Sequence, residues 1–429
     1  MSDTIEQLKT KLRDDDAEGV QDLLGRFPDL RALINQPVGP FDAPAIVCAR
    51  SRFMVDVLLA AGADINAKSR WWAGGFGLLD SAETELAEYA IARGAIVDIH
   101  AAVRLGKTEK LKELLTSDPG LVHARGGDGQ TPLHCAGTID IARYLLEHGA
   151  AIDARDVDHE STPAQYMVRD RREIASYLVT QGCQTDLLMA SALGDAGLVH
   201  RHLEGDPECI RMCVSDRWFP KVNPRSGGTI YIWTLGPAKT PHAVAREFGH
   251  EEVFEVLMQN SPDELKLAVA AELGDEAAVN KLQDRHPNLV RALTGDDRRK
   301  IADAARNNNT EAVRLMLAAG WPVDMRGQHG ATPLHWAAFH GNARMVQILL
   351  RGNPPLEQTD EDYQSTPLGW AIYGSENGWH QETGDYAGTV KALLRAGARP
   401  PQTLGGSDKV RAALRRQSEV SGEGKMPDS

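Results

Sequence analysis

Several acidic and histidine side chains in this sequence accompany tryptophans and tyrosines, a combination that can hold a ring-shaped molecule and exchange protons with it. A carboxylate and a histidine within hydrogen-bond reach of one substrate can act as general acid and base near neutral pH. The candidates for that chemistry are Asp80, Asp128, His159, His340, His380 and Asp385. Aromatic side chains offer flat apolar faces to another ring or to a sugar. The candidates for ligand contact are Trp71, Trp72, Trp218, Tyr231, Trp233, Phe339, Tyr373 and Trp379.

No known catalytic motif accompanies these residues. The sequence contains no Walker loop, no dinucleotide fingerprint after a strand and no HExxH pair. The segment GTIYIW (228–233) lacks a nucleophile elbow. His200 and His202 are two positions apart on a predicted helix, so they cannot face one metal together. Any catalytic site would therefore have to be assembled by the fold from distant residues.

The five cysteines indicate a reducing compartment and no metal centre. Cys48, Cys135, Cys183, Cys209 and Cys213 are odd in number and scattered, as expected for small core thiols in a cytoplasmic protein. The Cys209–Cys213 spacing resembles half of a zinc site, but no second half lies nearby. We therefore predict that the protein holds no metal and no cofactor.

Composition and charge exclude several classes of partner. Of 429 residues, 42% are hydrophobic and 25% charged, as in ordinary proteins with a packed core. The net charge of −13 would repel a phosphate backbone, so nucleic acid is not an expected partner. No apolar run approaches the length that spans a membrane, and MSDTIEQLKTKLRDDD (1–16) does not resemble a signal peptide. We expect a cytoplasmic location with no membrane contact.

The elements that must position the candidate residues are repeats. TPLHCA (131–136) recurs as TPLHWAA (332–338), and weaker copies begin at Thr162, Thr240 and Thr366. Each copy is followed by an apolar helical run. These units resemble the ankyrin-repeat family, whose unit of about 33 residues is a turn followed by two helices. In such a unit the threonine can cap the first helix, and proline fits the first turn because its missing N–H costs little there.

A second unit type lacks TPLH and carries a proline after its second helix. It occurs at 23–33, 114–124, 202–212 and 281–293, and in each case an apolar pair after the proline is expected to pack back. With degenerate units near 42–66 and 76–98, the pattern predicts about a dozen units over residues 4–399. The TPLH histidines, His134 and His335, are expected to hydrogen-bond within their own turns.

The resemblance implies an all-α protein, an ankyrin-repeat solenoid of about a dozen helix–turn–helix units with β-hairpin fingers. The array is expected over residues 1–401, with one extended finger at 212–239 and an insert within one repeat at 375–384. A capping helix is predicted at 402–420 and a disordered tail at 421–429.

Three departures from the repeat pattern carry the functional prediction. The first places Trp71 and Trp72 in an inter-repeat turn (66–77), where they either pack against the next finger or form a wall of a groove. The second is the extended finger, whose alternating TIYIWT (229–234) is typical of a strand. The third is the insert around Trp379, either a lid or an end-cap, which is similar to Gly-Trp-His…Gly-Asp-Tyr inserts of bacterial-looking ankyrin proteins.

Two functions remain open at this stage. The first is a cytoplasmic scaffold that binds a protein partner or a small-molecule ligand through an aromatic-rich groove on the concave face of the array. The alternative is an enzyme that uses general acid–base chemistry on a small cyclic, aromatic or sugar-like substrate in a pocket on that face.

Overall fold

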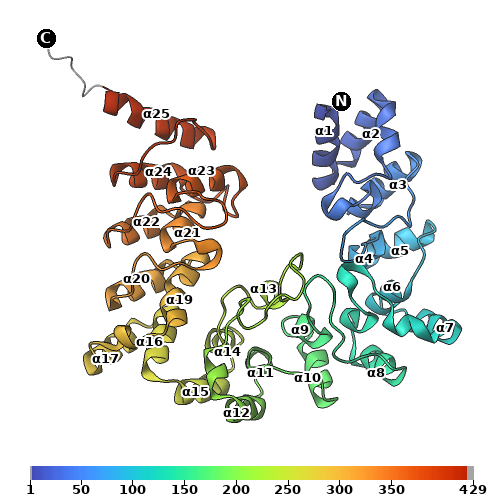
Figure 1. Ribbon diagram of the computed structural model, residues 1–429. Coiled ribbons are helices and arrows are strands. Elements are labelled where there is room, and N and C mark those ends of the chain that lie inside the picture. The colour runs from blue at the N-terminus through green and yellow to red at the C-terminus, as the bar shows by residue number, and fades with distance from the viewer. Residues whose placement is uncertain (1, 423–429) are drawn as a thin grey trace. The chain divides into compact units, whose positions relative to one another are not determined.

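The computed structural model describes residues 2–422 and divides them into two compact units (Figure 1). Unit 1 contains the chain up to Asp195 together with Val214–Gly236, and unit 2 contains Ala196–Cys213 together with the chain from Pro237 onward. Every regular element within residues 2–422 is helical. The prediction of an all-α repeat protein is therefore confirmed.

The α-helices of unit 1 are short and separated by turns and 3₁₀ segments. They are α1 (Ser2–Arg13), α2 (Ala17–Arg26), α3 (Arg52–Ala60), α4 (Leu78–Ser81), α5 (Thr84–Ala92), α6 (Ile99–Arg104), α7 (Thr108–Ser117), α8 (Ile139–Glu147), α9 (Pro163–Met167), α10 (Arg172–Thr180), α11 (Leu187–Leu193) and α13 (Tyr231–Thr234). The 3₁₀ segments are η1 (Pro28–Leu33), η2 (Pro40–Asp42), η3 (Ala45–Cys48), η4 (Pro119–His123), η5 (Gly127–Gly129) and η6 (Pro132–Cys135).

Unit 2 continues the same alternation of paired helices. Its α-helices are α12 (Ala196–Gly205), α14 (Pro241–Glu247), α15 (Glu251–Asn260), α16 (Asp263–Glu272), α17 (Glu276–Arg285), α18 (Leu289–Ala292), α19 (Gly295–Arg306), α20 (Thr310–Ala319), α21 (Pro333–Phe339), α22 (Ala343–Leu350), α23 (Pro367–Asn377), α24 (Tyr386–Arg395) and α25 (Asp408–Gly422). Its 3₁₀ segments are η7 (Pro207–Arg211) and η8 (Gln328–Gly330).

Within unit 2 the helices stack in two layers. The first helices α19, α21 and α23 contact one another in order, and the second helices α20, α22 and α24 do the same (Figure 1). Small residues such as Ala337 and Ala338 are fully buried in the first layer, which lets neighbouring helices approach closely. Leu349 is fully buried in the second layer. Each repeat thus completes its core only against its neighbours.

The proline-containing units fold as their pattern predicts. After α2, α7 and α12 the chain enters a 3₁₀ segment whose first residue is proline. Proline fits there because the first N–H of a helix has no partner within the helix. Leu30, Val122 and Ile210, which follow these prolines, are buried. The apolar residues therefore pack back as expected.

The predicted β-hairpin fingers are wrong for the part of the chain that the structure describes. In the extended finger the TIYIWT segment forms α13, with Thr234 N–H donating to the Ile230 carbonyl at 3.0 Å. A strand needs a partner strand, and the preceding stretch contains Pro220 and Pro224, which have no N–H to donate to a ladder. Alternation of side chains alone was therefore not sufficient to form a strand.

The end of the described chain is helical. Helix α25 packs against α24 and buries Val410 and Leu414. Most of the tail predicted to be disordered, 423–429, lies outside the described residues. Across residues 2–422, every helix is too short or too polar to cross a bilayer.

Candidate functional site

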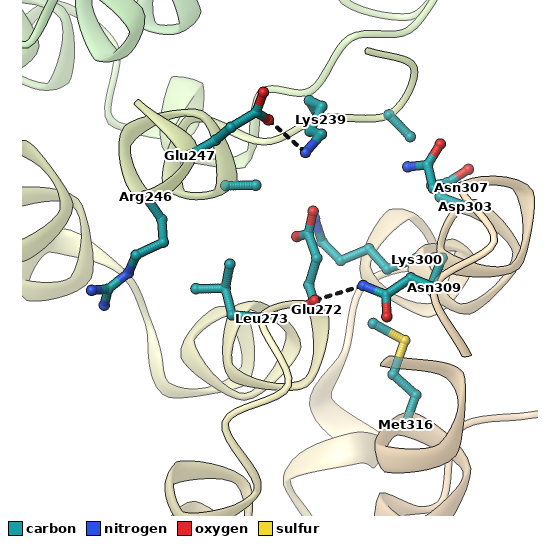
Figure 2. A pocket seen from close by; sticks show the side chains of 13 residues that line it. Lys239, Arg246, Glu247, Glu272, Leu273, Lys300, Asp303, Asn307, Asn309 and Met316 are labelled. Atoms are coloured by element: carbon teal, nitrogen blue, oxygen red, sulfur yellow. Dashed lines mark hydrogen bonds and ion pairs between the residues drawn. The ribbon is translucent and has the colours of Figure 1, made fainter. Parts of the chain in front are cut away.

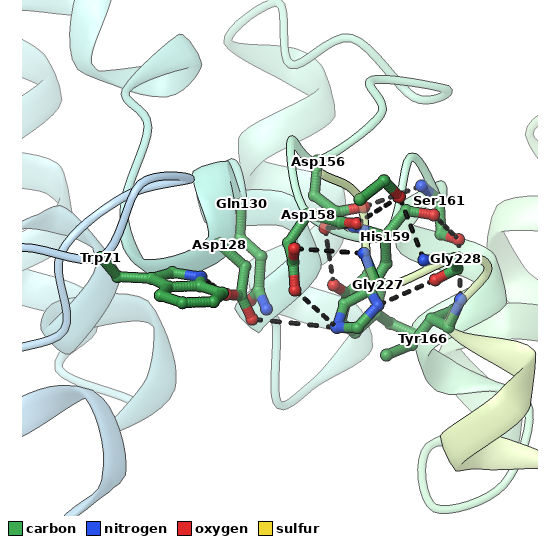
Figure 3. Close-up of polar contacts among 12 residues, drawn as sticks. Trp71, Asp128, Gln130, Asp156, Asp158, His159, Ser161, Tyr166, Gly227 and Gly228 are labelled. Atoms are coloured by element: carbon green, nitrogen blue, oxygen red, sulfur yellow. Dashed lines mark hydrogen bonds and ion pairs between the residues drawn. The ribbon is translucent and has the colours of Figure 1, made fainter. Parts of the chain in front are cut away.

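The turn before the first TPLH motif gathers three titratable side chains in unit 1. Asp128 lies at its tip with a left-handed φ of 54°, a conformation that aspartate tolerates better than most residues. The backbone N–H groups of Val157 and Asp158, in the next turn, donate to the Asp128 carbonyl at 2.8 and 3.1 Å. These bonds bring together Asp128, Asp158 and His159, which we call the turn cluster (Figure 3).

The side chains of the turn cluster lie at defined distances from one another and from their neighbours. His159 Nε2 lies 3.6 Å from Asp158 Oδ2 and 4.0 Å from Asp128 Oδ2. His159 Nδ1 lies 2.9 Å from the carbonyl oxygen of Gly228, which can only accept, so Nδ1 carries a proton. Trp71 Nε1 donates to Asp128 Oδ1 at 3.0 Å. The three clustered side chains are at most 16% exposed.

Burial changes the acidity of this cluster. It raises the pKa of Asp128 to about 6; His159 opposes the rise, while Asp158 and Asp156 add to it. Burial also raises the pKa of Asp156, although its carboxylate accepts hydrogen bonds from the backbone and from Tyr166. A carboxyl group with a pKa of about 6 can exchange a proton near neutral pH, and the catalytic role of Asp128 stays a prediction.

The extended finger covers this turn. Glu160 accepts hydrogen bonds from the N–H groups of Val222 and Asn223 at 2.7 and 2.6 Å. The N–H of Gly227 donates to the Asp158 carbonyl at 2.9 Å. The finger is thus attached to the 156–161 turn at several points, and the cluster lies beneath it.

The aromatic side chains of unit 1 lie in three different settings. Trp218 lines a cavity of about 490 Å³, together with His159. Trp72 lies beneath the guanidinium of Arg225, which is 4.5 Å from the ring centroid. Trp233 is 73% exposed. These positions leave the rings available for contact, which stays a prediction.

Tyr231 requires a correction, because it was predicted to contact a ligand. Its side chain is fully buried, and its hydroxyl donates to Asp186 at 2.8 Å. The ring of Phe219 packs against it at 5.3 Å between centroids. Tyr231 therefore anchors the extended finger and offers no surface to a ligand.

In unit 2 the insert folds back onto the end of α21 and builds what we call the aromatic platform. The Trp379 ring centroid lies 5.2 Å from that of Phe339 and 6.1 Å from that of Trp336. The Arg306 guanidinium lies 5.5 Å from the Trp336 centroid and 6.0 Å from that of Trp379. His340, 5.6 Å from Trp379 between centroids, completes the group. Trp379 nevertheless stays 60% exposed.

Glycines allow this close approach. A Cβ at Gly374 would lie 2.5 Å from the Phe339 carbonyl oxygen, and one at Gly384 would lie 2.7 Å from that of His340. Such distances are far below a normal contact, so a larger residue would push the insert away from α21. The glycines of the insert are therefore required by packing and not by flexibility.

Three buried polar atoms of the platform have no hydrogen-bond partner among the described residues: Arg306 Nε, Trp336 Nε1 and His340 Nδ1. His340 Nε2 donates to the Arg306 carbonyl at 2.8 Å, so Nδ1 is an acceptor. Burial lowers the pKa of His340 to about 4, and its ring is therefore neutral at pH 7. Buried polar groups in native proteins nearly always find a partner. The platform thus has two donors and one acceptor that the protein itself does not match.

Of the two other predicted residues of unit 2, His380 lies beside the platform and Tyr373 is exposed on a neighbouring helix. The rings of His380 and His340 are 5.1 Å apart between centroids. Tyr373 is on α23, 61% exposed. The structure thus brings together His340, His380, Phe339 and Trp379 in unit 2, and Asp128, His159 and Trp71 in unit 1.

A cavity of about 630 Å³ in unit 2 contains charged residues that the sequence did not suggest (Figure 2). Lys239 pairs with Glu247 at 2.8 Å. Burial raises the pKa of Asp303 to about 6 and also raises that of Glu272, while Lys300 opposes both shifts. Because cations and carboxylates are intermixed, the cavity does not favour a ligand of one charge.

Comparison with known proteins identifies the repeats. The pattern of the ankyrin-repeat family matches three stretches, 99–189, 265–360 and 301–403, which together cover more than half of the sequence. The chain belongs to the ankyrin-repeat family. The predicted role of the TPLH histidines agrees with this: His134 Nδ1 accepts from the N–H of Thr131 at 3.0 Å, and His335 makes the same bond at 3.1 Å.

Several relatives share the ankyrin repeats over part of their length. The E3 ubiquitin-protein ligase KEG of Arabidopsis thaliana is 23% identical over 321 residues, 62% of this chain and 20% of that protein. The ankyrin repeat and SAM domain-containing protein 6 of Mus musculus is 31% identical over 122 residues, 28% and 14% of the two chains. The protein VAPYRIN-LIKE of Medicago truncatula is 28% identical over 256 residues, which are 58% of this chain and 50% of that protein.

This ankyrin-repeat chain thus spans half or less of each of these relatives. Their further domains and activities are properties of those proteins. The bacterial origin that the insert suggests stays a prediction.

Two acid–base candidates have structural roles in the ankyrin fold. Asp80 accepts from the N–H of Gly77 at 2.6 Å at the start of α4, and Asp385 accepts from that of Gly388 at 2.8 Å at the start of α24. Carboxylates in these positions stabilise helix N-termini. Both carboxylates therefore have a structural role, and their role in catalysis stays a prediction.

The sequence did not indicate Arg306 as a site residue. Aligning AARNN (304–308) with AAFHG (337–341) places Arg306 at the position of Phe339 in the next ankyrin repeat. First helices stack, so equivalent positions in adjacent repeats lie side by side. An alignment of the repeats with one another would therefore have placed the arginine beside the aromatic rings.

Proposed function

We propose that this ankyrin-repeat protein is an interaction module that binds a segment of a partner protein on the aromatic platform of unit 2. The observation that carries the proposal is the set of unmatched atoms of Arg306, Trp336 and His340, next to an exposed tryptophan. Aromatic and arginine side chains dominate the energetic centres of protein interfaces. An exposed indole held in place by neighbouring rings is a surface of this kind.

The unmatched atoms of the platform determine which hydrogen-bond groups a bound segment must supply. Carbonyl groups of an extended segment would accept from Arg306 Nε and Trp336 Nε1, and an amide N–H would donate to His340 Nδ1. These atoms are buried in the free protein, so Trp379 must turn aside to admit the segment and then pack against one of its apolar side chains. The insert is then a lid that becomes part of the interface. On unit 1, Trp71, Trp72, Trp218 and Trp233 are predicted to contact a ligand independently.

The acid–base enzyme remains the alternative, and its support comes from the turn cluster. Asp128 and His159 lie beside each other, and the pKa of Asp128 is raised by burial to about 6. Acid–base catalysis also needs a substrate position within reach of both groups. Since Asp80 and Asp385 cap helices, the remaining catalytic candidates form two separate pairs, and we favour the interaction module.

Peptide display on the full chain tests the proposal. Peptides selected against the parent protein should bind Trp379→Ala about thirtyfold more weakly, because truncating a central aromatic typically costs about 2 kcal/mol. Trp336→Phe should weaken binding about tenfold, through the loss of one buried donor. Trp336→Phe should leave the melting temperature nearly unchanged, because Nε1 has no partner in the free protein.

Phe53→Ala is the matched control, since this ring is 46% exposed on α3 of unit 1. It should leave peptide affinity unchanged. Selected peptides that bind both platform variants as tightly as the parent would show that the platform is not the binding surface. A lowered melting temperature in Trp379→Ala without any specific loss of binding would assign the ring to structure alone.

A further inference from the structure

We propose that the turn cluster of Asp128, Asp158 and His159 binds a divalent transition-metal cation such as Zn²⁺. Each side chain offers one ligand atom, and these atoms all lie within 4.8 Å of one another. The cluster joins two turns separated by about 30 residues in sequence, a spacing that follows from the repeat length. It lies in unit 1 and is independent of the aromatic platform.

The distances fit a cation in the centre. Zinc bonds to histidine nitrogen and carboxylate oxygen are about 2.0–2.2 Å long, so tetrahedral ligand atoms lie about 3.4 Å apart. His159 Nε2 is 3.6 Å from the oxygen of Asp158 and 4.0 Å from that of Asp128. Small side-chain rotations bring all three atoms to coordination distance.

Two carboxylates and one imidazole nitrogen converge on a single point in the turn cluster. Because His159 Nδ1 donates to the Gly228 carbonyl, Nε2 is the ring nitrogen that faces the two carboxylates. Nε2 makes no hydrogen bond to any described residue, and its distance from Asp158 Oδ2 exceeds a hydrogen bond. Asp158 is only 8% exposed, and its Oδ1 accepts from the N–H of Gly227 at 3.3 Å. Two largely buried carboxylates beside a ring nitrogen favour a positive charge between them.

The surrounding groups orient the ligands as in known metal sites. A histidine ligand usually donates its second ring N–H to a carbonyl or carboxylate, and here the carbonyl of Gly228 accepts it. A carboxylate ligand is usually held by a hydrogen-bond donor, and here Trp71 Nε1 donates to Asp128 (Figure 3). Gly228 belongs to the extended finger, so a bound cation would hold the finger closed over the turn.

The donor set selects the class of cation. Calcium and magnesium prefer oxygen ligands alone, whereas zinc and related transition metals accept imidazole together with carboxylate. Three protein ligands leave a coordination position for water or for a group of a bound molecule. His159 also lines the cavity of about 490 Å³ next to Trp218, which provides space for such a group.

The equivalent turn of unit 2 serves as an internal control. There His329 takes the place of Asp128, and its Nδ1 lies 2.7 Å from Asp362, a normal hydrogen bond. Tyr363 stands where the first turn has His159. This pair is satisfied and more exposed, at 27% and 56% for the two side chains. The same turn in the second repeat therefore lacks the group of three ligand side chains.

Titration of the full chain, freed of metal with a chelator, with ZnCl₂ and CoCl₂ tests the site. We expect one equivalent of Zn²⁺ to bind and to raise the melting temperature of the parent protein, because a ligand of the folded state stabilises it. His159→Gln and Asp128→Asn should each weaken binding at least about tenfold, which is the size of effect seen even for groups around a metal's ligands. His329→Gln should bind as the parent does.

The cysteine thiols require their own control, since Cys209 and Cys213 could take up Zn²⁺. The double variant Cys209→Ser/Cys213→Ser should keep the full equivalent, and bound Co²⁺ should lack the strong near-ultraviolet absorption of a thiolate complex. Loss of binding in that double variant would overturn the proposal. The same conclusion follows if the parent binds no stoichiometric Zn²⁺, if Zn²⁺ leaves its melting temperature unchanged, or if His159→Gln binds equally well. If His159→Gln does not fold, the change in the melting temperature of the parent protein on addition of Zn²⁺ still tests the proposal.

Discussion

The two TPLH repeats, beginning at Thr131 in unit 1 and Thr332 in unit 2, share their turn but present different chemistry. In both, the tip residue has a left-handed φ, 54° at Asp128 and 61° at His329. In both, an arginine supports the turn: Arg125 donates to the Gly129 carbonyl at 2.7 Å, and its counterpart does the same at 2.9 Å. The backbone is therefore conserved within the chain, and the side chains differ.

A difference of three residues separates the first helices of these repeats. The cap of the second helix follows seven positions after Thr131, at Thr138, but ten positions after Thr332, at Asn342. The shorter repeat forms only the 3₁₀ segment η6, whereas the longer one forms α21 and carries the platform residues at its end. The length of the first helix therefore determines where the candidate site residues lie. In the shorter repeat they lie in the turn before η6, and in the longer repeat they lie at the end of α21.

Acidification should produce the largest difference in stability between the two units. Burial lowers the pKa of His242 to about 3 and those of His335 and His340 to about 4 in unit 2, while His134 at about 4 is the counterpart in unit 1. Because the folded pKa lies below the unfolded value near 6.5, stability is fully present above that pH and is lost as pH falls toward 4. Each histidine contributes up to about 3 kcal/mol to that loss.

Unit 2 should therefore unfold first on acidification. Carboxyl groups whose pKa values are raised by burial act in the opposite direction in both units: Asp80, Asp128 and Asp156 in unit 1, and Glu272 and Asp303 in unit 2. Hydrogen exchange by mass spectrometry at pH 7 and pH 5, corrected for the intrinsic exchange rates, measures which unit opens first. Earlier opening of unit 1 would contradict the assignment.

Truncation of the equivalent core leucine should affect both repeats alike. Leu145 in α8 and Leu349 in α22 are fully buried, and replacing either by alanine should cost about 2–5 kcal/mol. Urea denaturation measures the loss, and neighbouring repeats should loosen first. An unchanged midpoint for Leu349→Ala would show that the helix faces the other way.

Removing one attachment point of the extended finger should have a smaller effect than truncating a core leucine. The effect should be confined to unit 1. Glu160→Ala removes the acceptor for the N–H groups of Val222 and Asn223, at a cost of about 1 kcal/mol because the contact is near the surface. Faster exchange of these two amides measures it. Gln364→Ala, at the matched position of unit 2, should leave them unchanged. Equal protection in Glu160→Ala would mean that other contacts hold the finger.

The smallest effect is expected at the second turn. His329→Gln breaks an exposed pair with Asp362, and such pairs contribute about 0–1 kcal/mol. Thermal denaturation should detect no more than a shift of this size. A larger loss would show that this turn is as closely packed as the first, and it would remove His329 as a control for the turn cluster.

The fold could be predicted from the sequence because the repeat is a local pattern. Thr332, Pro333 and His335 form their capping contacts within four residues, and an apolar helix follows. Leu349 could be assigned to the core from helical spacing alone. Where prediction depended on a partner it failed: TIYIWT alternates as a strand does, but no second strand is present, and Tyr231 is buried against Asp186.

The sequence by itself also determined which residue types were available for the sites. It indicated Asp128 and His159 as turn residues, Phe339 as a residue of a first helix, and Trp379 as part of an insert that departs from the repeat pattern. Only the tertiary structure decided which of them meet. Asp128 reaches His159 because adjacent turns exchange backbone hydrogen bonds, and Arg306 reaches Trp379 because equivalent positions of stacked first helices lie side by side. Contacts between repeats depend on stacking geometry, which the pattern within one repeat does not encode.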